Sequence, residues 1–85
     1  MSKNIYVGNL NYEVSSNGLE AMFAEYGEVL SARVITDHYT SQSKGFGFVE
    51  MADSAAADAA IAALNGKEWL SRNIKVNEAQ DRGRR

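Results

Sequence analysis

The residues with the clearest chemical potential in this chain are three aromatic rings in two β-rich segments. Side chains of a strand point alternately to its two faces, so Phe46 and Phe48 share one face of residues 44–51. Flat rings interleaved with cations suit unpaired nucleic-acid bases, because bases stack on aromatic rings while Lys and Arg meet the phosphates. The same parity assigns to one face Tyr6, Arg33, Ile35, Lys44, Phe46, Phe48, Glu50, Lys75 and Asn77.

A second interpretation of the rings is core packing or cross-strand stabilisation. Parity argues against core packing, because Ile5, Val7 and Val49 already occupy the opposite side of the same strands. We therefore expect the rings on a solvated face. An exposed apolar cluster rimmed by charge is typical of a binding surface.

Hydrophobic periodicity predicts the elements that position these residues. Apolar residues recur at i, i+3, i+4 and i+7 in two helices, and Gly27 is expected to end the first of them in a left-handed conformation. Ser15 is the expected N-cap of the first helix, and Asp53 or Ser54 that of the second. A short piece around residues 67–69 is expected to pair before the last strand. The predicted strands are residues 4–10, 29–36, 44–51 and 73–79, and the predicted helices are residues 15–26 and 54–64.

The predicted order is β-α-β-β-α-β. Two amphipathic helices can cover only one face of a four-stranded sheet, so the other face must meet water. We therefore predict an α+β fold, a ferredoxin-like sandwich whose antiparallel sheet carries both helices on one face.

Composition limits the function of this 85-residue chain, which is long enough for one domain. It has no Cys and a single His, which excludes disulfides, Cys-based metal sites and a Cys/His nucleophile pair. No apolar run approaches the ~20 residues of a membrane span, and no signal peptide is evident. We expect a cytoplasmic protein without cofactors and without membrane contact.

The charge balance does not by itself indicate nucleic acid, since 9 Lys and Arg stand against 11 Asp and Glu, a net charge of -2. The placement of the charges matters instead. The predicted helices carry carboxylates, while cations lie on the predicted open face and at the C-terminus, so we expect the two faces to differ in potential. The helix-side carboxylates are Glu20, Glu25, Asp53 and Asp58.

Residues 44–51, Lys-Gly-Phe-Gly-Phe-Val-Glu-Met, resemble the octamer signature of the RNA recognition motif, K/R-G-F/Y-G/A-F-V-x-F/Y. Residues 5–10, Ile-Tyr-Val-Gly-Asn-Leu, resemble its hexamer partner. Met51 departs from the octamer, and by parity it should fill core volume. The resemblance covers residues 3–79, which we expect to form the domain, with residues 80–85 as a short basic tail.

The resemblance implies a role for each matching residue. Tyr6 and Phe48 should each stack on a base, Phe46 should contact ribose, and Lys44 should meet a phosphate. Arg33 is a further phosphate candidate on the same face. The last strand and the tail should reach base edges and backbone through Lys75, Asn77, Gln80 and Arg82.

The expected partner is single-stranded RNA, with single-stranded DNA as an alternative, and we expect a monomer that takes no small-molecule substrate. Short chains with one such motif resemble the small RNA-binding proteins of bacteria, including cyanobacteria, which suggests post-transcriptional regulation or RNA chaperoning. Two other interpretations stay open. The fold could dock a peptide on its sheet or helices, or serve a small enzyme such as an acylphosphatase. The enzyme would need an arginine in its phosphate-binding loop, and residues 8–11 hold none, so we rank it last and expect no enzymatic activity.

Overall fold

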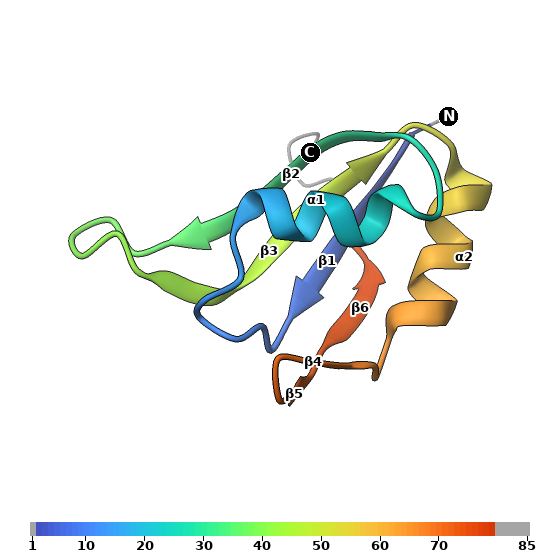
Figure 1. Cartoon of the computed structure of the whole chain (residues 1–85). Helices are drawn as coiled ribbons and strands as arrows, with labels where there is room; N and C mark the ends of the chain where they lie inside the picture. Colours follow the sequence, from blue (N-terminus) through green and yellow to red (C-terminus); the bar gives the residue numbers. More distant parts are fainter. Residues whose placement is uncertain (1, 80–85) are drawn as a thin grey trace.

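A computed structural model describes residues 2–79. Gln80 and Arg82, with the rest of the expected tail at 80–85, lie outside the described residues. Figure 1 shows the elements in chain order, and their bounds are β1 (Lys3–Gly8), α1 (Ser16–Ala24), β2 (Val29–Thr36), β3 (Ser43–Met51), α2 (Ser54–Leu64), β4 (Glu68–Trp69), β5 (Arg72–Asn73) and β6 (Lys75–Glu78).

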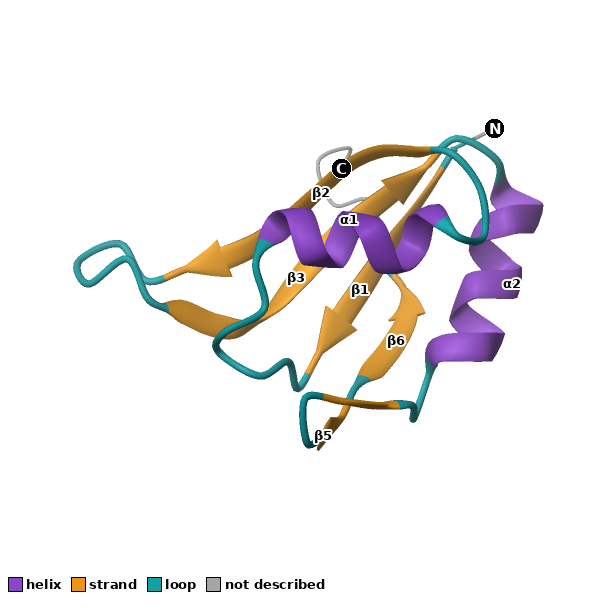
Figure 2. Cartoon of the chain, viewed as in Figure 1, coloured by secondary structure: helices purple, strands orange, loops and turns teal. Residues whose placement is uncertain are grey.

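Four strands form one antiparallel sheet in the order β2-β3-β1-β6. Both helices lie against the same face of this sheet (Figure 2). The predicted ferredoxin-like α+β architecture is confirmed, with one addition: β4 and β5 form a small separate hairpin before β6. Within residues 2–79, neither helix has the length and the apolar character that a crossing of a bilayer requires.

The core lies between the sheet and the helices. Met51 is fully buried, as parity predicted, and Phe23 is among the largest buried side chains. Small side chains on α2 let this helix pack closely on the sheet. The buried hydrophobic residues of this core are Ile5, Val7, Leu10, Val14, Leu19, Phe23, Val49, Met51, Ala57, Ala60, Leu64, Ile74 and Val76.

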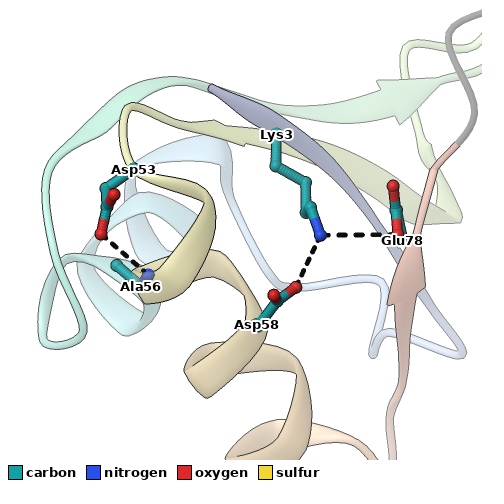
Figure 3. Close-up of polar contacts among 5 residues, drawn as sticks. All are labelled: Lys3, Asp53, Ala56, Asp58 and Glu78. Carbon is teal, nitrogen blue, oxygen red and sulfur yellow. Dashed lines mark hydrogen bonds and ion pairs between the residues drawn. The ribbon is translucent and has the colours of Figure 1, made fainter. Parts of the chain in front are cut away.

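The helix starts follow the predicted capping chemistry. The Ser15 hydroxyl accepts a hydrogen bond from the Gly18 amide at 3.1 Å, and the Asp53 carboxylate accepts one from the Ala56 amide at 3.1 Å (Figure 3). Both side chains satisfy amides that an isolated helix leaves without partners. The prediction for α2 is confirmed at both ends, whereas α1 is shorter than the predicted 15–26.

Three boundary predictions were wrong. Gly27 has a φ of 159°, so it is not in the left-handed helical region. A glycine is required there because a Cβ would lie 2.7 Å from the Ala56 Cβ. β1 ends at Gly8, since Asn9 has a left-handed φ of 56°. The predicted strand 73–79 is split by Ile74, with Asn73 in β5 and β6 starting at Lys75.

Polar side chains accept hydrogen bonds from backbone amides on both edge strands of the sheet. The Ser16 hydroxyl accepts from the Val34 amide on β2 at 3.0 Å. The Asn65 side-chain oxygen accepts from the Val76 amide on β6 at 3.0 Å. These contacts reduce the number of free edge amides that could pair with another chain.

An ion cluster joins β1, α2 and β6 (Figure 3). The Lys3 ammonium lies 2.7 Å from an Asp58 carboxylate oxygen and 3.5 Å from a Glu78 carboxylate oxygen. The hydrogen bond to Asp58 is the main cause that raises the pKa of Lys3 above its ordinary 10.5. The cluster therefore links β1 to α2 and β6, which lie far along the chain.

Candidate nucleic-acid interface

The face of the sheet opposite the helices, called here the open face, carries the predicted aromatic residues. The strand register puts four of its residues in one row across all four strands. Arg33 pairs with Phe48, Phe48 with Tyr6, and Tyr6 with Asn77. The register thus brings together residues that are up to 71 positions apart in the sequence (6 to 77).

The remaining predicted residues of described strands lie next to this row. Phe46 comes two residues before Phe48 on β3 and therefore shares its face. Lys75 pairs with Gly8, two residues beyond the Tyr6–Asn77 pair and on the same face. Lys44 lies at the start of the same β3 face and is exposed.

The three rings pack against one another. Tyr6 lies 6.0 Å from Phe46 and 5.8 Å from Phe48 between ring centroids, and the two phenylalanine rings are 6.1 Å apart. Their interplanar angles of 32°, 62° and 89° are those of tilted and edge-to-face contacts. We call these residues the aromatic triad. Each ring is half-buried, so the three rings support one another and still expose part of their surface on the open face.

The cations around the triad are available to a ligand. Arg33, Lys44 and Lys75 are all exposed, and the ion pairs found within residues 2–79 involve Lys3 alone among the cations. Lys44 does act on one neighbour, Asp37. The amides of Thr40 and Tyr39 chiefly hold the pKa of Asp37 below its ordinary 3.8, and the charge of Lys44 adds to this effect.

The two faces carry different charges, as the sequence predicted. Neither α1 nor α2 contains a Lys or Arg, and their carboxylates Glu20 and Asp58 are exposed. The charged side chains of these two helices are thus negative, whereas the open face offers cations beside the aromatic triad.

The sequence did not predict one set of hydrogen bonds near the interface. The Arg72 guanidinium donates to the Asn9 side-chain oxygen at 2.7 Å and to the Asn9 carbonyl at 3.3 Å. The Asn9 side-chain amide in turn donates to the Asn73 carbonyl at 2.8 Å. These hydrogen bonds connect the turn after β1 to the β4–β5 hairpin. Asn9 and Asn11 are residue types that favour turns, but their spacing does not indicate which strand they contact.

A cavity of about 450 Å³ opens on the helix side. It lies where α1 meets the end of α2 and β4, so it is separate from the open face. The residues that line it are Gly18, Ala21, Met22, Glu25, Tyr26, Leu64, Lys67 and Trp69.

Residues 5–75 match the family model described as "RNA recognition motif". A relative in Nostoc, RbpA, provisionally named as an RNA-binding protein, is 55% identical over 78 residues, which cover 92% of this chain and 76% of the relative.

Solved structures agree with this match. The crystal structure of RNA Binding Protein PG1 superposes with a TM-score of 0.92 at 51% identity, covering 94% of this chain and 96% of that one. The RRM of Rna15 with bound RNA (GU) superposes with a TM-score of 0.83 at 26% identity, covering 92% of this chain and 83% of that one.

Proposed function

We propose that this chain, which belongs to the RNA recognition motif family, binds single-stranded RNA by stacking bases on the aromatic triad of its open face. The observation that carries the proposal is the row Arg33–Phe48–Tyr6–Asn77, in which two rings stand between a cation and an amide. Such a row offers stacking, phosphate neutralisation and base-edge hydrogen bonds within one strip of the sheet.

Each residue has a distinct role in this proposal. Tyr6 and Phe48 stack on successive bases, and Phe46 covers a ribose. Lys44 and Arg33 contact phosphates. The β6 residues and the tail reach base edges and backbone through Lys75, Asn77, Gln80 and Arg82.

The expected affinity follows from the contacts. Stacking is worth ~1–3 kcal/mol per base, and ordering a flexible strand offsets part of it, so two to three nucleotides give a dissociation constant on the order of micromolar.

We assign the RNA-binding domain to residues 3–79, and we propose that it acts as a monomer in the cytoplasm. Post-transcriptional regulation or RNA chaperoning is the process that fits a small module with this affinity. No catalysis is assigned to it.

The test is an NMR titration of the full chain with a short single-stranded RNA. Ring resonances of Tyr6, Phe46 and Phe48 should shift, and amides of α1 and α2 should not. The same sequence as single-stranded DNA measures the discrimination between the two sugars, and a double-stranded RNA is the negative control. Unshifted ring signals at saturating RNA would disprove stacking on the triad.

Peptide docking is the second candidate, because the helix-side cavity contains Met22, Tyr26 and Trp69. It uses a different surface, so the same titration separates the two functions. Shifts confined to α1, the end of α2 and β4 would indicate the cavity.

A further inference from the structure

One residue of the open face has a charge that does not suit phosphate binding. Glu50 lies on β3 between Asn4 of β1 and Ser31 of β2, with which it pairs on either side. These three residues form a second row, called here the acceptor row, next to the Arg33–Phe48–Tyr6–Asn77 row. The acceptor row contains no cation.

Glu50 is close to the stacking platform. It follows Phe48 by two positions on a regular strand, so the two side chains share a face and are about 7 Å apart along it. Its buried neighbours in sequence, Val49 and Met51, are 1% and 0% exposed, which fixes the opposite orientation of Glu50. The Glu50 side chain therefore lies on the open face directly beside the ring on which a base would stack.

The carboxylate has unused hydrogen-bonding capacity. Glu50 is half-buried, and within residues 2–79 no cation lies in salt-bridge distance of it. The carboxylate oxygens can therefore accept N–H donors that a ligand brings. A surface that bound only the RNA backbone would gain from a neutral or basic residue at this position.

We propose that Glu50 selects guanine at the base stacked on Phe48. This inference rests on the proposed RNA-binding function and specifies its sequence preference. An ionised carboxylate only accepts hydrogen bonds, through two oxygens. Guanine presents two adjacent donors on its Watson–Crick edge, the N1–H and the 2-amino group, and both can bond to one carboxylate.

The other bases fit this acceptor less well. Adenine and cytosine each present an amino donor beside a ring nitrogen that accepts, which would face the second carboxylate oxygen unfavourably. Uracil presents one N3–H between two carbonyl oxygens. The phosphates of the same strand are expected on the side of Lys75 and Lys44, away from the acceptor row, because the negative charge of Glu50 repels them.

The test uses uridine pentamers that carry guanosine, inosine or adenosine at the central position. Inosine lacks the 2-amino group and keeps N1–H. Affinities are measured by fluorescence anisotropy for the full wild-type chain, for Glu50→Gln and for Glu20→Gln. The last variant is the matched control, since it removes one negative charge from α1 on the other side of the molecule.

The wild-type chain should bind the guanosine pentamer about tenfold more tightly than the adenosine pentamer, with inosine between them, as expected for a bidentate contact. Glu50→Gln should reduce this preference to about twofold or less, and Glu20→Gln should retain it. NMR spectra of both variants establish that they are folded.

Two results would overturn the inference. In the first, Glu50→Gln strengthens all three pentamers by the same factor and keeps their order, so that Glu50 acts only by charge repulsion. In the second, the wild-type chain binds all three pentamers equally, and RNA binding stands without the guanine preference. If the wild-type chain binds none of the pentamers, the proposed RNA-binding function is disproved, and the guanine preference is disproved with it.

Discussion

The phenol ring of Tyr6 occupies the space beside the Gly8 Cα in which any other residue would carry its Cβ. A Cβ at that position would lie 2.8 Å from both Cε2 and Cζ of the ring. The two residues are on the same face of β1, so the glycine lets the ring lie along the strand. Gly8 therefore leaves the space that the Tyr6 ring of the aromatic triad occupies.

Gly8→Ala should weaken RNA binding with little loss of stability. The added carbon displaces the end of a flexible side chain and leaves the backbone in place, so the free energy of unfolding should change by less than about 1 kcal/mol. The displaced ring stacks less well, and the dissociation constant should rise about three- to tenfold. Urea unfolding and fluorescence anisotropy measure the two effects.

Gly18→Ala is the matched control, because a Cβ there meets the Ser15 Oγ at an ordinary 3.5 Å. It should stabilise α1 by up to ~1 kcal/mol and leave binding unchanged. Equal affinities for Gly8→Ala and the wild-type chain would show that the ring position is not set by Gly8.

Gly47→Ala should reduce stability. A Cβ at Gly47 would collide with the Arg33 carbonyl oxygen and lie 3.0 Å from the Val34 Cα, and both of these atoms belong to the backbone of β2. Because a strand cannot rotate away as a side chain can, the free energy of unfolding should fall by about 1–3 kcal/mol. A midpoint in urea like that of Gly8→Ala would contradict this distinction.

Replacing Phe46 and Phe48 together by Ala should abolish detectable RNA binding. The two rings lie outside the buried core, but they pack on each other and on Tyr6. We therefore expect a loss of about 1–3 kcal/mol of stability from the contacts within the triad, and a chain that stays folded at 25 °C. Thermal unfolding followed by circular dichroism, together with anisotropy, measures both.

Met51→Ala gives the reverse pattern. Met51 is 0% exposed and faces the helices, so the variant should lose about 2–5 kcal/mol of stability and bind normally while it is folded. A larger loss of stability from the phenylalanine pair than from Met51 would mean that the triad belongs to the core.

Salt should affect RNA binding weakly. Each phosphate contacted on a single strand contributes a slope of ~0.7 to the dependence of log affinity on log salt concentration. Arg33, Lys44 and Lys75 are the exposed cations beside the triad, so the slope should be about 1.5–3. Lys44→Met should lower it by about 0.7.

Lys67→Met is the control for this titration, since Lys67 lines the helix-side cavity and should leave the slope unchanged. A slope well above about 3 would indicate that phosphate contacts dominate stacking.

The Lys3 cluster should make stability depend on alkaline pH. The pKa of Lys3 is raised in the folded chain, chiefly by its hydrogen bond to Asp58. The contribution is therefore fully present below the ordinary value of 10.5 and is lost as the pH rises through the higher folded value. Melting temperatures recorded from about pH 9 upward should fall more steeply for the wild-type chain than for Lys3→Met. Parallel curves would show that the cluster adds no stability.

Local pattern alone predicted a large part of this molecule. The bounds of β2 and α2, the Ser15 and Asp53 caps and the burial of Met51 depend on residues close together in sequence. Strand parity has the same local origin, because alternate side chains must point to opposite faces. For that reason the residue types on the open face, including all three rings, could be assigned before the fold was known.

Tertiary structure decided how those residues meet. The strand order β2-β3-β1-β6 and its register align Arg33 with Phe48 and Tyr6 with Asn77, and no local periodicity encodes which strands pair. Gly27 is needed because α2 brings Ala56 against it. Asn9, directly after the end of β1, is held by a hydrogen bond from Arg72. These contacts join segments far apart in the chain, so their geometry exists only once the core has packed.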